Sequence, residues 1–306
     1  MSKRYSLGEI KRKVVDVLKD TETGLSGVEM AEKTGVNRIT ITKYLSVLEA
    51  IGLVKRKKVG SVNVWYLGQG VTEFELPIDI LDVQRLYMNA LFNHSEDEAR
   101  RMLINVLHSN VDPIKILTDV ITPTLNTAGE LYSRGRMTVT ETMFVTNLIE
   151  ESIDLIKFNA EREDTKSNAY TTFMSAPGEL HTIGPKMISV AFYLKGWNSY
   201  FLGNVASEVD LLFDIDLLKF LNKIWTTQGG IMIIGVSVTL KEHLKGVGET
   251  IKSVKSKLGK NVFALIGGEA VSSEDELTSG VDADFYAKDI NSAIDWAEQL
   301  YKKAKW

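Results

Sequence analysis

Two residues that could do chemistry, Glu179 and His181, lie in the loop "APGELHTIG" (residues 176–184). The segment before this loop, "NAYTTFMS", has the composition of a strand, and "PKMISVAFYL" after it favours a helix. A histidine between a strand and a helix can be a metal ligand, a general base or a side chain without a special role. A single histidine in a loop most often has no special role, so other residues must show whether His181 is functional.

Strands and helices alternate from residue 168 to the end of the chain. The expected strands are "AYTTFMS", "NSYFLG", "GIMIIGVSV", "NVFALIGG" and "ADFYAKD". Because "GIMIIGVSV" is almost wholly apolar, it is typical of a strand buried on both faces of a parallel sheet. We predict that residues 168–306 form a doubly wound, Rossmann-like α/β domain with a parallel sheet. Ligands bind such domains at the carboxyl ends of the strands. The loops there match neither a dinucleotide-binding pattern nor a P-loop.

Small and polar residues recur at these strand ends in three groups. They are Glu179-x-His181-x-x-Gly184, Ser237-x-Thr239 and Gly267-Gly268. The series resembles the cobalamin-binding domains that hold the cofactor "base-off, His-on", whose pattern is Asp-x-His-x-x-Gly, Ser-x-Leu and Gly-Gly. Glu179 replaces the aspartate of that pattern, Thr239 replaces its leucine, and the spacing from Gly184 to Ser237 is about ten residues longer than usual.

The resemblance implies a role for each residue. His181 would replace the cofactor's own dimethylbenzimidazole as the lower ligand of cobalt, and Glu179 would orient its imidazole. The displaced nucleotide tail would run along the sheet, where Ser237, Gly267 and Gly268 leave room for it. A plain strand-to-loop turn is the alternative role of the two glycines. His94, His108 and His243 show no ligand spacing, and we expect ordinary surface roles for them.

Residues 77–165 are expected to form four helices in a four-helix bundle. The bundle resembles the cap that covers the upper face of the corrin ring in cobalamin-dependent photoreceptor regulators. In those regulators a Trp is followed, after nine residues, by Glu-His. Here Tyr132 stands for the Trp and Thr142-Met143 for the Glu-His pair. Tyr132 and Met143 would pack over an upper-face group or within the core. The missing histidine predicts a weak or absent light response.

Residues 1–68 have the organisation of a winged helix-turn-helix. Ser26 and Glu29 form a capping box, Gly35 permits a tight turn, and Asn37 caps a second helix. Two short strands follow, joined around residues 60–61. Polar and basic residues at the start of the second helix and on the hairpin are the candidates for contacts with DNA. They are Arg38, Thr40, Thr42, Lys43, Lys55, Arg56, Lys57 and Lys58.

The charge distribution supports the same division of the chain. Residues 1–66 hold 13 lysines and arginines against 7 acidic residues, although the net charge of all 306 residues is −4. A basic module on an acidic body is typical of a chain whose first domain meets a polyanion. The chain has no cysteine, which excludes disulfides and thiolate metal sites. No apolar run is long enough for a membrane span. We therefore expect a cytoplasmic protein that contacts double-stranded DNA and no membrane.

The leading hypothesis is a cobalamin-responsive transcription regulator that is not an enzyme and acts as a homo-oligomer, a dimer or tetramer, on a repeated site. In the second hypothesis, the α/β domain of a regulator binds haem, a small effector or nothing. The third is a corrinoid carrier for methyl transfer, against which the basic amino-terminal module argues.

Overall fold

The computed structural model describes residues 5–303, apart from positions 20, 22, 51–52, 68–78, 110, 205–212, 227–228 and 272–280. The chain divides into two compact units, Met1–Leu148 and Ile149–Trp306. The border between the units falls inside one continuous helix, α8 (Val139–Asn159). The expected domain boundaries at residues 68 and 77 lie outside the described residues, so the three-domain division stays a prediction.

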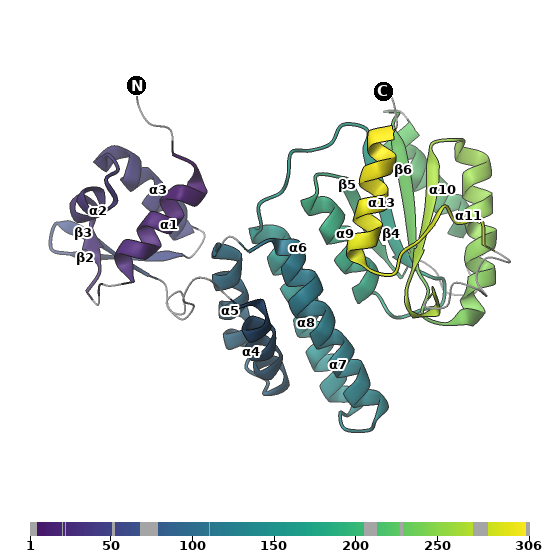
Figure 1. Ribbon diagram of the computed structural model, residues 1–306, viewed down its shortest axis with the longest axis horizontal. Coiled ribbons are helices and arrows are strands. Elements are labelled where there is room, and N and C mark those ends of the chain that lie inside the picture. Colours follow the sequence, from purple (N-terminus) through teal and green to yellow (C-terminus); the bar gives the residue numbers. More distant parts are fainter. Residues whose placement is uncertain are drawn as a thin grey trace. The chain divides into compact units, whose positions relative to one another are not determined.

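The amino-terminal module, residues 5–67, combines three helices with a small antiparallel sheet (Figure 1). The helices are α1 (Leu7–Leu18), α2 (Gly27–Thr34) and α3 (Arg38–Ala50). The sheet has the order β1-β3-β2 and consists of β1 (Leu25–Ser26), β2 (Val54–Val59) and β3 (Val62–Leu67). Its core holds Ile10, Met30, Ile41, Leu45 and Trp65, all 3% exposed or less. Apolar residues at helical spacing therefore provide the core of this module.

Local hydrogen bonds set the ends of α2 and α3. The Ser26 hydroxyl accepts a bond from the Glu29 backbone N–H at 3.3 Å, and the Glu29 carboxylate accepts one from Ser26 N at 2.7 Å. Gly35 ends α2 with a φ of 66°, a left-handed conformation that glycine adopts readily. Asn37 Oδ1 then accepts a bond from Ile39 N at 2.9 Å. The expected capping box, turn and helix cap are all present.

Four helical segments follow. They are α4 (Ile80–Phe92), α5 (Glu96–His108), a third segment made of α6 (Pro113–Ile116), η1 (Leu117–Ile121) and α7 (Thr122–Ser133), and α8. The third segment contains a π-helical turn, η1, which ends two residues before Pro123. Proline lacks an N–H, and a wider turn accommodates the interrupted hydrogen-bond ladder. The Thr122 hydroxyl donates to the Leu117 carbonyl at 2.9 Å within this turn.

The carboxyl-terminal unit contains a parallel sheet of five strands, as the sequence predicts. The strands are β4 (Ala169–Ser175), β5 (Asn198–Gly203), β6 (Ile231–Ser237), β7 (Val262–Gly267) and β8 (Phe285–Tyr286). Their order is β5-β4-β6-β7-β8, and all neighbouring pairs are parallel. The strand order reverses between β4 and β6. Their carboxyl ends form the topological switch point, the place where doubly wound sheets bind ligands.

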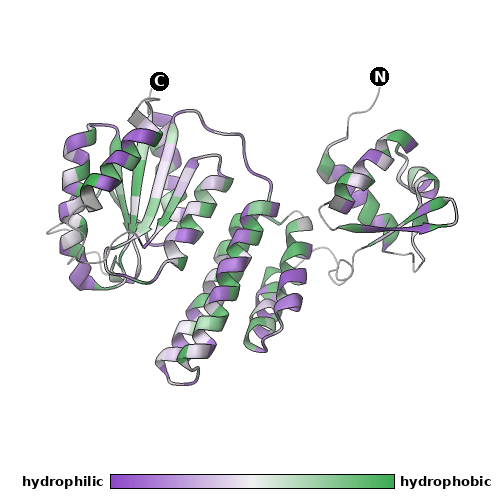
Figure 2. Cartoon of the chain, turned by 180° about the vertical axis from the view of Figure 1, so that it is seen from behind, coloured by the Kyte–Doolittle hydropathy of each residue, from purple (hydrophilic) through white to green (hydrophobic). Residues whose placement is uncertain are grey.

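Helices cover both faces of this sheet (Figures 1 and 2). The side chains of Tyr170 and Met174 face a core that α10 (Phe213–Leu221) and α11 (Leu244–Leu258) complete. Phe173 points to the opposite face and packs against Phe192 of α9 (Ile183–Leu194), their ring centroids 5.0 Å apart. On that face α9 contacts β4 and β5, and α13 (Ile290–Lys303) contacts α9 and β8.

Short helical turns complete the described part of this unit: η2 (Asn222–Thr226), η3 (Lys241–His243) and η4 (Glu269–Val271). None of the helices in the described residues combines the length and apolar character that a membrane crossing needs.

Candidate cofactor-binding site

The loops that follow β4 and β6 meet at the switch point. Ser175 and Ser237 are in register at the ends of these strands, and the Ala176 N–H donates to the Ser237 carbonyl at 2.8 Å. A Cβ atom on Gly184, at the start of α9, would lie 3.8 Å from the Ser237 hydroxyl oxygen. The sheet therefore brings the first two groups of sequence-predicted residues into one place.

At the switch point, Glu179 is buried and held by several hydrogen bonds. Its side chain is 0% exposed. Its Oε1 accepts hydrogen bonds from Thr239 N at 2.8 Å and Leu240 N at 2.9 Å, and its Oε2 accepts from Thr239 N at 2.9 Å. The Thr239 side chain also hydrogen-bonds the carboxylate, a bond that the leucine of the family pattern could not make.

A histidine across the loops also bonds to this carboxylate. His243 Nδ1 lies 3.0 Å from Glu179 Oε1. Burial favours a raised pKa for Glu179, but the bonds from Leu240, His243 and Thr239 outweigh it and hold the pKa below its usual value. An ionised carboxylate can only accept, so Nδ1 of His243 carries the hydrogen of this bond.

The expected hydrogen bond between Glu179 and the His181 ring is not formed among the described residues. The His181 side chain is exposed, and its ring makes no hydrogen bond or ion pair within the described part of the chain. Its backbone is fixed, because the Ser175 hydroxyl donates to the His181 carbonyl at 2.7 Å. His181 lies in the loop after β4, but the Glu179 carboxylate turns toward the backbone of the next loop.

The expectation that His243 is an ordinary surface residue is wrong. Its side chain is only 13% exposed, in η3 at the carboxyl end of β6. One signal in the sequence could have found it: His243 follows Thr239 by four residues, in the loop that the parallel sheet directs to the same edge as Glu179.

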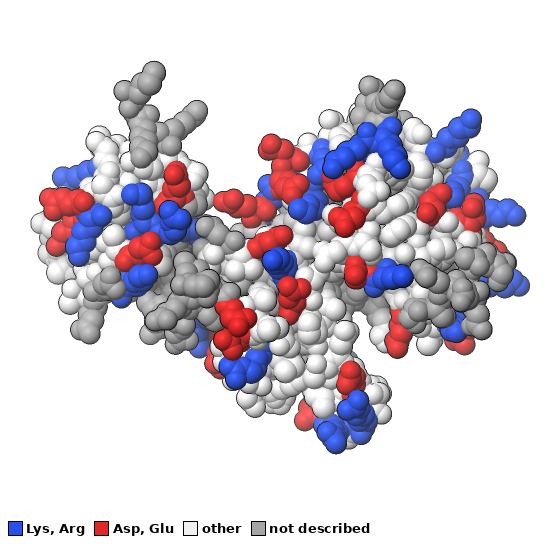
Figure 3. Space-filling model, in the orientation of Figure 1, with Lys and Arg blue, Asp and Glu red and all other residues white. Residues whose placement is uncertain are grey.

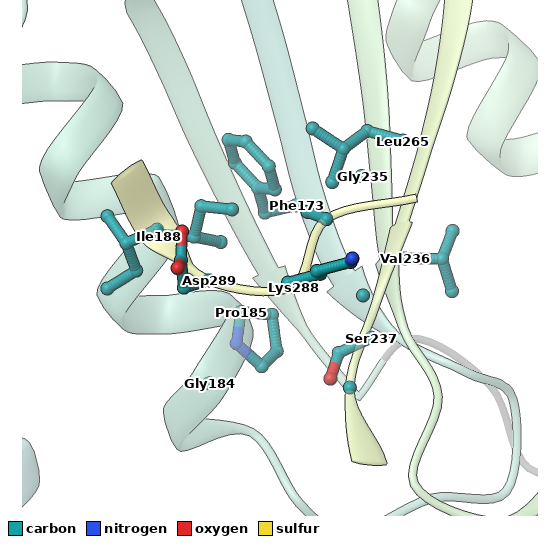
Figure 4. A pocket seen from close by; sticks show the side chains of 14 residues that line it. Phe173, Gly184, Pro185, Ile188, Gly235, Val236, Ser237, Leu265, Lys288 and Asp289 are labelled. Atoms are coloured by element: carbon teal, nitrogen blue, oxygen red, sulfur yellow. The ribbon is translucent and has the colours of Figure 1, made fainter. Parts of the chain in front are cut away.

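A cavity of about 160 Å³ opens beside the switch point, between the sheet and the helices of the α9 face (Figure 4). Glycines and apolar side chains form most of its wall. Its lining includes Phe173, Gly184, Pro185, Ile188, Gly235, Val236, Ser237, Leu265, Gly267 and Gly268, with Lys288 and Asp289. A cavity with such a wall fits a largely apolar group.

The two glycines at the end of β7 have different roles. A Cβ on Gly267 would meet the Ala287 carbonyl oxygen at 3.5 Å, which is ordinary contact, so its missing side chain leaves space in the cavity. Gly268 has a φ of 103°, and a Cβ there would collide with the Val238 backbone. Gly268 is thus required by the close approach of the β6 and β7 loops, which the Ala270 N–H to Val238 carbonyl bond at 3.0 Å also joins.

Comparisons with known proteins indicate which cofactor the chain binds. Residues 83–157 match the family model described as "B12 binding domain". Dimethylamine corrinoid protein 3 of Methanosarcina acetivorans is 21% identical over 193 residues, which cover 63% of this chain and 84% of the relative. Dimethylamine corrinoid protein 1 of the same organism is 22% identical over 62% of this chain and 84% of the relative.

A solved structure agrees at the level of the fold. The monomethylamine corrinoid protein of Methanosarcina barkeri matches 72% of this chain and 100% of its own chain, with a TM-score of 0.59 and 15% identity. The chain carries a cobalamin-binding domain. The prediction of cobalamin as the cofactor is therefore confirmed.

In the cobalamin-binding domain, the last turns of α8 hold the loop that carries His181. The Thr182 hydroxyl donates to the Glu150 carboxylate at 3.3 Å. Lys186, in the first turns of α9, pairs with Asp154 at 2.8 Å and donates to the Glu150 carbonyl at 3.3 Å. Because α8 also belongs to the region that matches the B12 family model, these bonds connect the matched region to the loop of the candidate ligand.

The cap residues singled out from the sequence are exposed. Tyr132 is 49% and Met143 61% exposed, so neither fills the core, which was the alternative role for them. Thr142 donates its hydroxyl to the Thr138 carbonyl at 2.9 Å. His94 has a φ of 59° and packs edge-on against Phe144, with ring centroids 5.1 Å apart.

The structure places the DNA-binding candidates on α3 and β2. Arg38, Thr42 and Lys43 on α3 are exposed, Thr40 is half-buried, and Lys55, Arg56, Lys57 and Lys58 on β2 are all exposed. Arg56 is tied to its own module, because its Nε lies 3.2 Å from Glu49 and its guanidinium 5.4 Å from the Trp65 ring. Acidic and basic side chains are interspersed on the visible face of this module (Figure 3).

Proposed function

We propose that the chain is a cobalamin-responsive transcription regulator. In this proposal, the amino-terminal module is a winged helix-turn-helix that binds double-stranded DNA, and the cobalamin-binding domain senses the cofactor. The observation that carries the proposal is the joining of two features in one chain. The exposed basic residues of α3 and β2 form one module, and a cobalamin-binding domain follows them.

His181 is the proposed lower ligand of cobalt. It lies at the carboxyl end of β4, beside the switch point, and its exposed ring has no hydrogen-bond partner among the described residues. Cobalamin, when bound, would supply a cobalt centre that changes its ligands with oxidation and alkylation state. The chain's part is to present an imidazole from a loop whose backbone is fixed, with Glu179 two residues before it in the sequence.

The cavity beside Ser237 is the proposed place of the displaced nucleotide tail. Its apolar wall suits a benzimidazole ring, which offers little hydrogen bonding. Tyr132 and Met143 are the residues proposed to pack over the upper face, because both are exposed apolar side chains. No acid–base or nucleophilic role is needed from any of these residues, in line with a sensor that is not an enzyme.

Helix α3 of the amino-terminal module supports the DNA-binding part of the proposal. Asn37 caps α3, so Arg38 lies in the first turn of a helix with exposed polar residues. A recognition helix uses such positions to reach base edges and phosphates. Lys55, Lys57 and Lys58 on the hairpin would contact the phosphate backbone beside it.

Cofactor and DNA are coupled only if the cofactor binds two arrangements of the protein with different affinity. A homo-oligomer on a repeated site provides such arrangements, because the spacing of its DNA-binding modules must match the spacing of the half-sites. We infer that the cofactor state biases this spacing.

Two experiments test the proposal. The first mixes the purified protein with methyl-, adenosyl- and hydroxocobalamin, removes free cofactor, and compares the absorbance spectrum with that of His181→Ala. The wild type should retain corrinoid with a spectrum that the variant changes. Retention with identical spectra would refute the role of His181 as ligand.

The second experiment measures the binding of the protein to DNA of its own promoter with and without bound corrinoid, at several salt concentrations. We expect the affinity to change with cofactor state, and to fall as salt rises because phosphate contacts release counterions. Equal affinity for promoter and unrelated DNA in every cofactor state would refute regulation.

A corrinoid carrier for methyl transfer is the second candidate. The names of the two relatives favour this candidate, because both are dimethylamine corrinoid proteins. The match covers 84% of the length of each relative. A carrier would bind corrinoid but show no specific binding to promoter DNA, so the second experiment separates the two candidates.

A further inference from the structure

Two histidines belong to the switch-point loops that meet at the Glu179 carboxylate. His181 follows it by two residues, and His243 reaches it from η3. We propose that Glu179 serves both imidazoles, His243 through Oε1 and the cobalt-bound His181 through Oε2. His243 is then a positioning residue that sets how strong a ligand His181 is. This inference rests on the proposed role of His181 as the lower ligand.

The carboxylate is held without the help of either histidine. Thr239 N and Leu240 N both donate to it at 2.8–2.9 Å, and its side chain is 0% exposed. Backbone donors remain in place when a side chain is replaced. A change at His243 therefore alters the charge available on the carboxylate while its position persists.

Oε2 has acceptor capacity for a second imidazole. Each carboxylate oxygen offers about two lone-pair sites. Oε1 takes three donors, the N–H groups of Thr239 and Leu240 and the ring of His243. Oε2 takes a share of the Thr239 N–H, and the Thr239 side chain adds one bond to the carboxylate, so among the described residues Oε2 takes at most two donors. The less occupied oxygen is thus the one that remains for a further donor.

The His181 ring can donate the further hydrogen bond that Glu179 Oε2 can accept. Its ring is exposed and without a partner among the described residues. An imidazole that binds a metal through one nitrogen almost always donates its other N–H to a carboxylate, a carbonyl or water, and a carboxylate raises its basicity. Glu179 lies two residues away in the sequence, and its carboxylate oxygens already accept hydrogen bonds, so it is the acceptor that fits His181.

The hydrogen bond from His243 to Glu179 reduces the effect of this carboxylate on the basicity of His181. Each donor to a carboxylate takes up part of its negative charge, so a carboxylate that already accepts from an imidazole polarises a second imidazole less. His243 therefore moderates the basicity of His181. Removal of His243 should make His181 a stronger ligand, whereas removal of the Glu179 charge should make it weaker.

The experiment compares His243→Ala and His243→Gln with the wild type, using full-length protein loaded with Co(II) corrinoid. Uniform ¹⁵N labelling of the protein first shows whether a protein nitrogen binds cobalt, because an axial ¹⁵N gives a two-line splitting in electron paramagnetic resonance and ¹⁴N a three-line one. The midpoint potential of the Co(II)/Co(I) couple is then measured. Co(I) holds no axial ligand, so a stronger lower ligand makes this potential more negative.

We expect His243→Ala to strengthen His181 ligation severalfold and to shift the potential to more negative values. His243→Gln, whose amide can still donate to Glu179, should stay close to the wild type. Glu179→Gln should shift the potential the opposite way, with ligation weaker by about 10- to 100-fold. Lys245→Gln, at an exposed position in the first turn of α11, is the matched control and should have no effect.

The double variant His181→Ala/His243→Ala makes the test specific. In the His181→Ala background, loss of His243 should leave the potential unchanged, because the coupled ligand is gone. The role of His243 is wrong if the potential of His243→Ala is unchanged or more positive. It is also wrong if His243→Ala shifts the potential equally in the wild-type and His181→Ala backgrounds. Either outcome leaves His181 ligation itself standing. A three-line splitting from the labelled wild-type protein overturns His181 ligation itself and this inference with it.

Discussion

Phe173 and Gly235 are in register on the neighbouring strands β4 and β6, and the Phe173 ring occupies the space that a Gly235 side chain would need. The ring is 1% exposed and also packs against Phe192 of α9. Both residues line the cavity of the candidate site. The absence of one side chain in the middle of a strand thus determines the shape of the cavity floor.

The first prediction concerns this pair. Gly235→Ala should destabilise the protein by about 1–3 kcal/mol, because the buried ring must move to admit a methyl group. It should also weaken corrinoid retention, since the displaced ring enters the cavity. Urea unfolding and corrinoid retention after gel filtration measure the two effects. Gly246→Ala is the control: its Cβ would meet no atom within 4 Å, and alanine favours the helix by about 1 kcal/mol.

The second prediction separates the two glycines at the end of β7. Gly268→Ala should cost more than about 1 kcal/mol of stability, because a left-handed backbone and a collision with the Val238 backbone both oppose the new side chain. Gly267→Ala should leave stability nearly unchanged and reduce corrinoid affinity. If both variants unfold at the same urea concentration as the wild type, the structural role given to Gly268 is wrong.

The third prediction concerns pH and the ion pairs of Glu163. Burial favours a raised pKa for this carboxyl, but Lys195 at 2.7 Å and Lys166 at 3.5 Å outweigh it and lower its pKa. A lowered pKa in the folded state stabilises the protein above the unfolded pKa, about 4.3, and this stability is lost as pH falls through the folded value.

Glu163→Gln should therefore unfold at a lower urea concentration than the wild type at pH 7, and the difference should shrink below about pH 4. Urea titrations across this pH range measure it. Glu161→Gln, at an exposed position of the same segment, should show no such pH-dependent difference. A gap between Glu163→Gln and the wild type that stays constant with pH would contradict the ion-pair explanation.

The fourth prediction distinguishes the basic residues of β2. Lys57→Ala should weaken DNA binding equally on different sequences and reduce the slope of log affinity against log salt by about 1, as expected for one lost phosphate contact. Arg56→Ala should lower the stability of the amino-terminal module, because it removes the contacts with Glu49 and Trp65. Binding isotherms at several salt concentrations and thermal unfolding provide the measurements.

The fifth prediction concerns light. Thr142 and Met143 carry no imidazole, so illumination of the protein with bound adenosylcobalamin should change its DNA affinity little. Gel shifts in the dark and after illumination test this. A large light-induced change in DNA affinity would contradict this prediction.

Much of the site follows from the sequence. Apolar strands separated by helices predict a parallel sheet, and parallel strands end at one edge, so Glu179, Ser237 and Gly267 had to come close together. The caps of α2 and α3 were equally predictable, because a capping box depends on residues three positions apart. These features depend on local spacing or on strand order.

The tertiary structure alone decided which partners the site residues have. Sixty-four positions separate Glu179 from His243, and their bond at 3.0 Å depends on how two loops fold against each other. The Phe173 ring over Gly235 and the left-handed Gly268 against Val238 are of the same kind. Side-chain direction and close packing between distant segments are set by the whole core, which no spacing along the chain records.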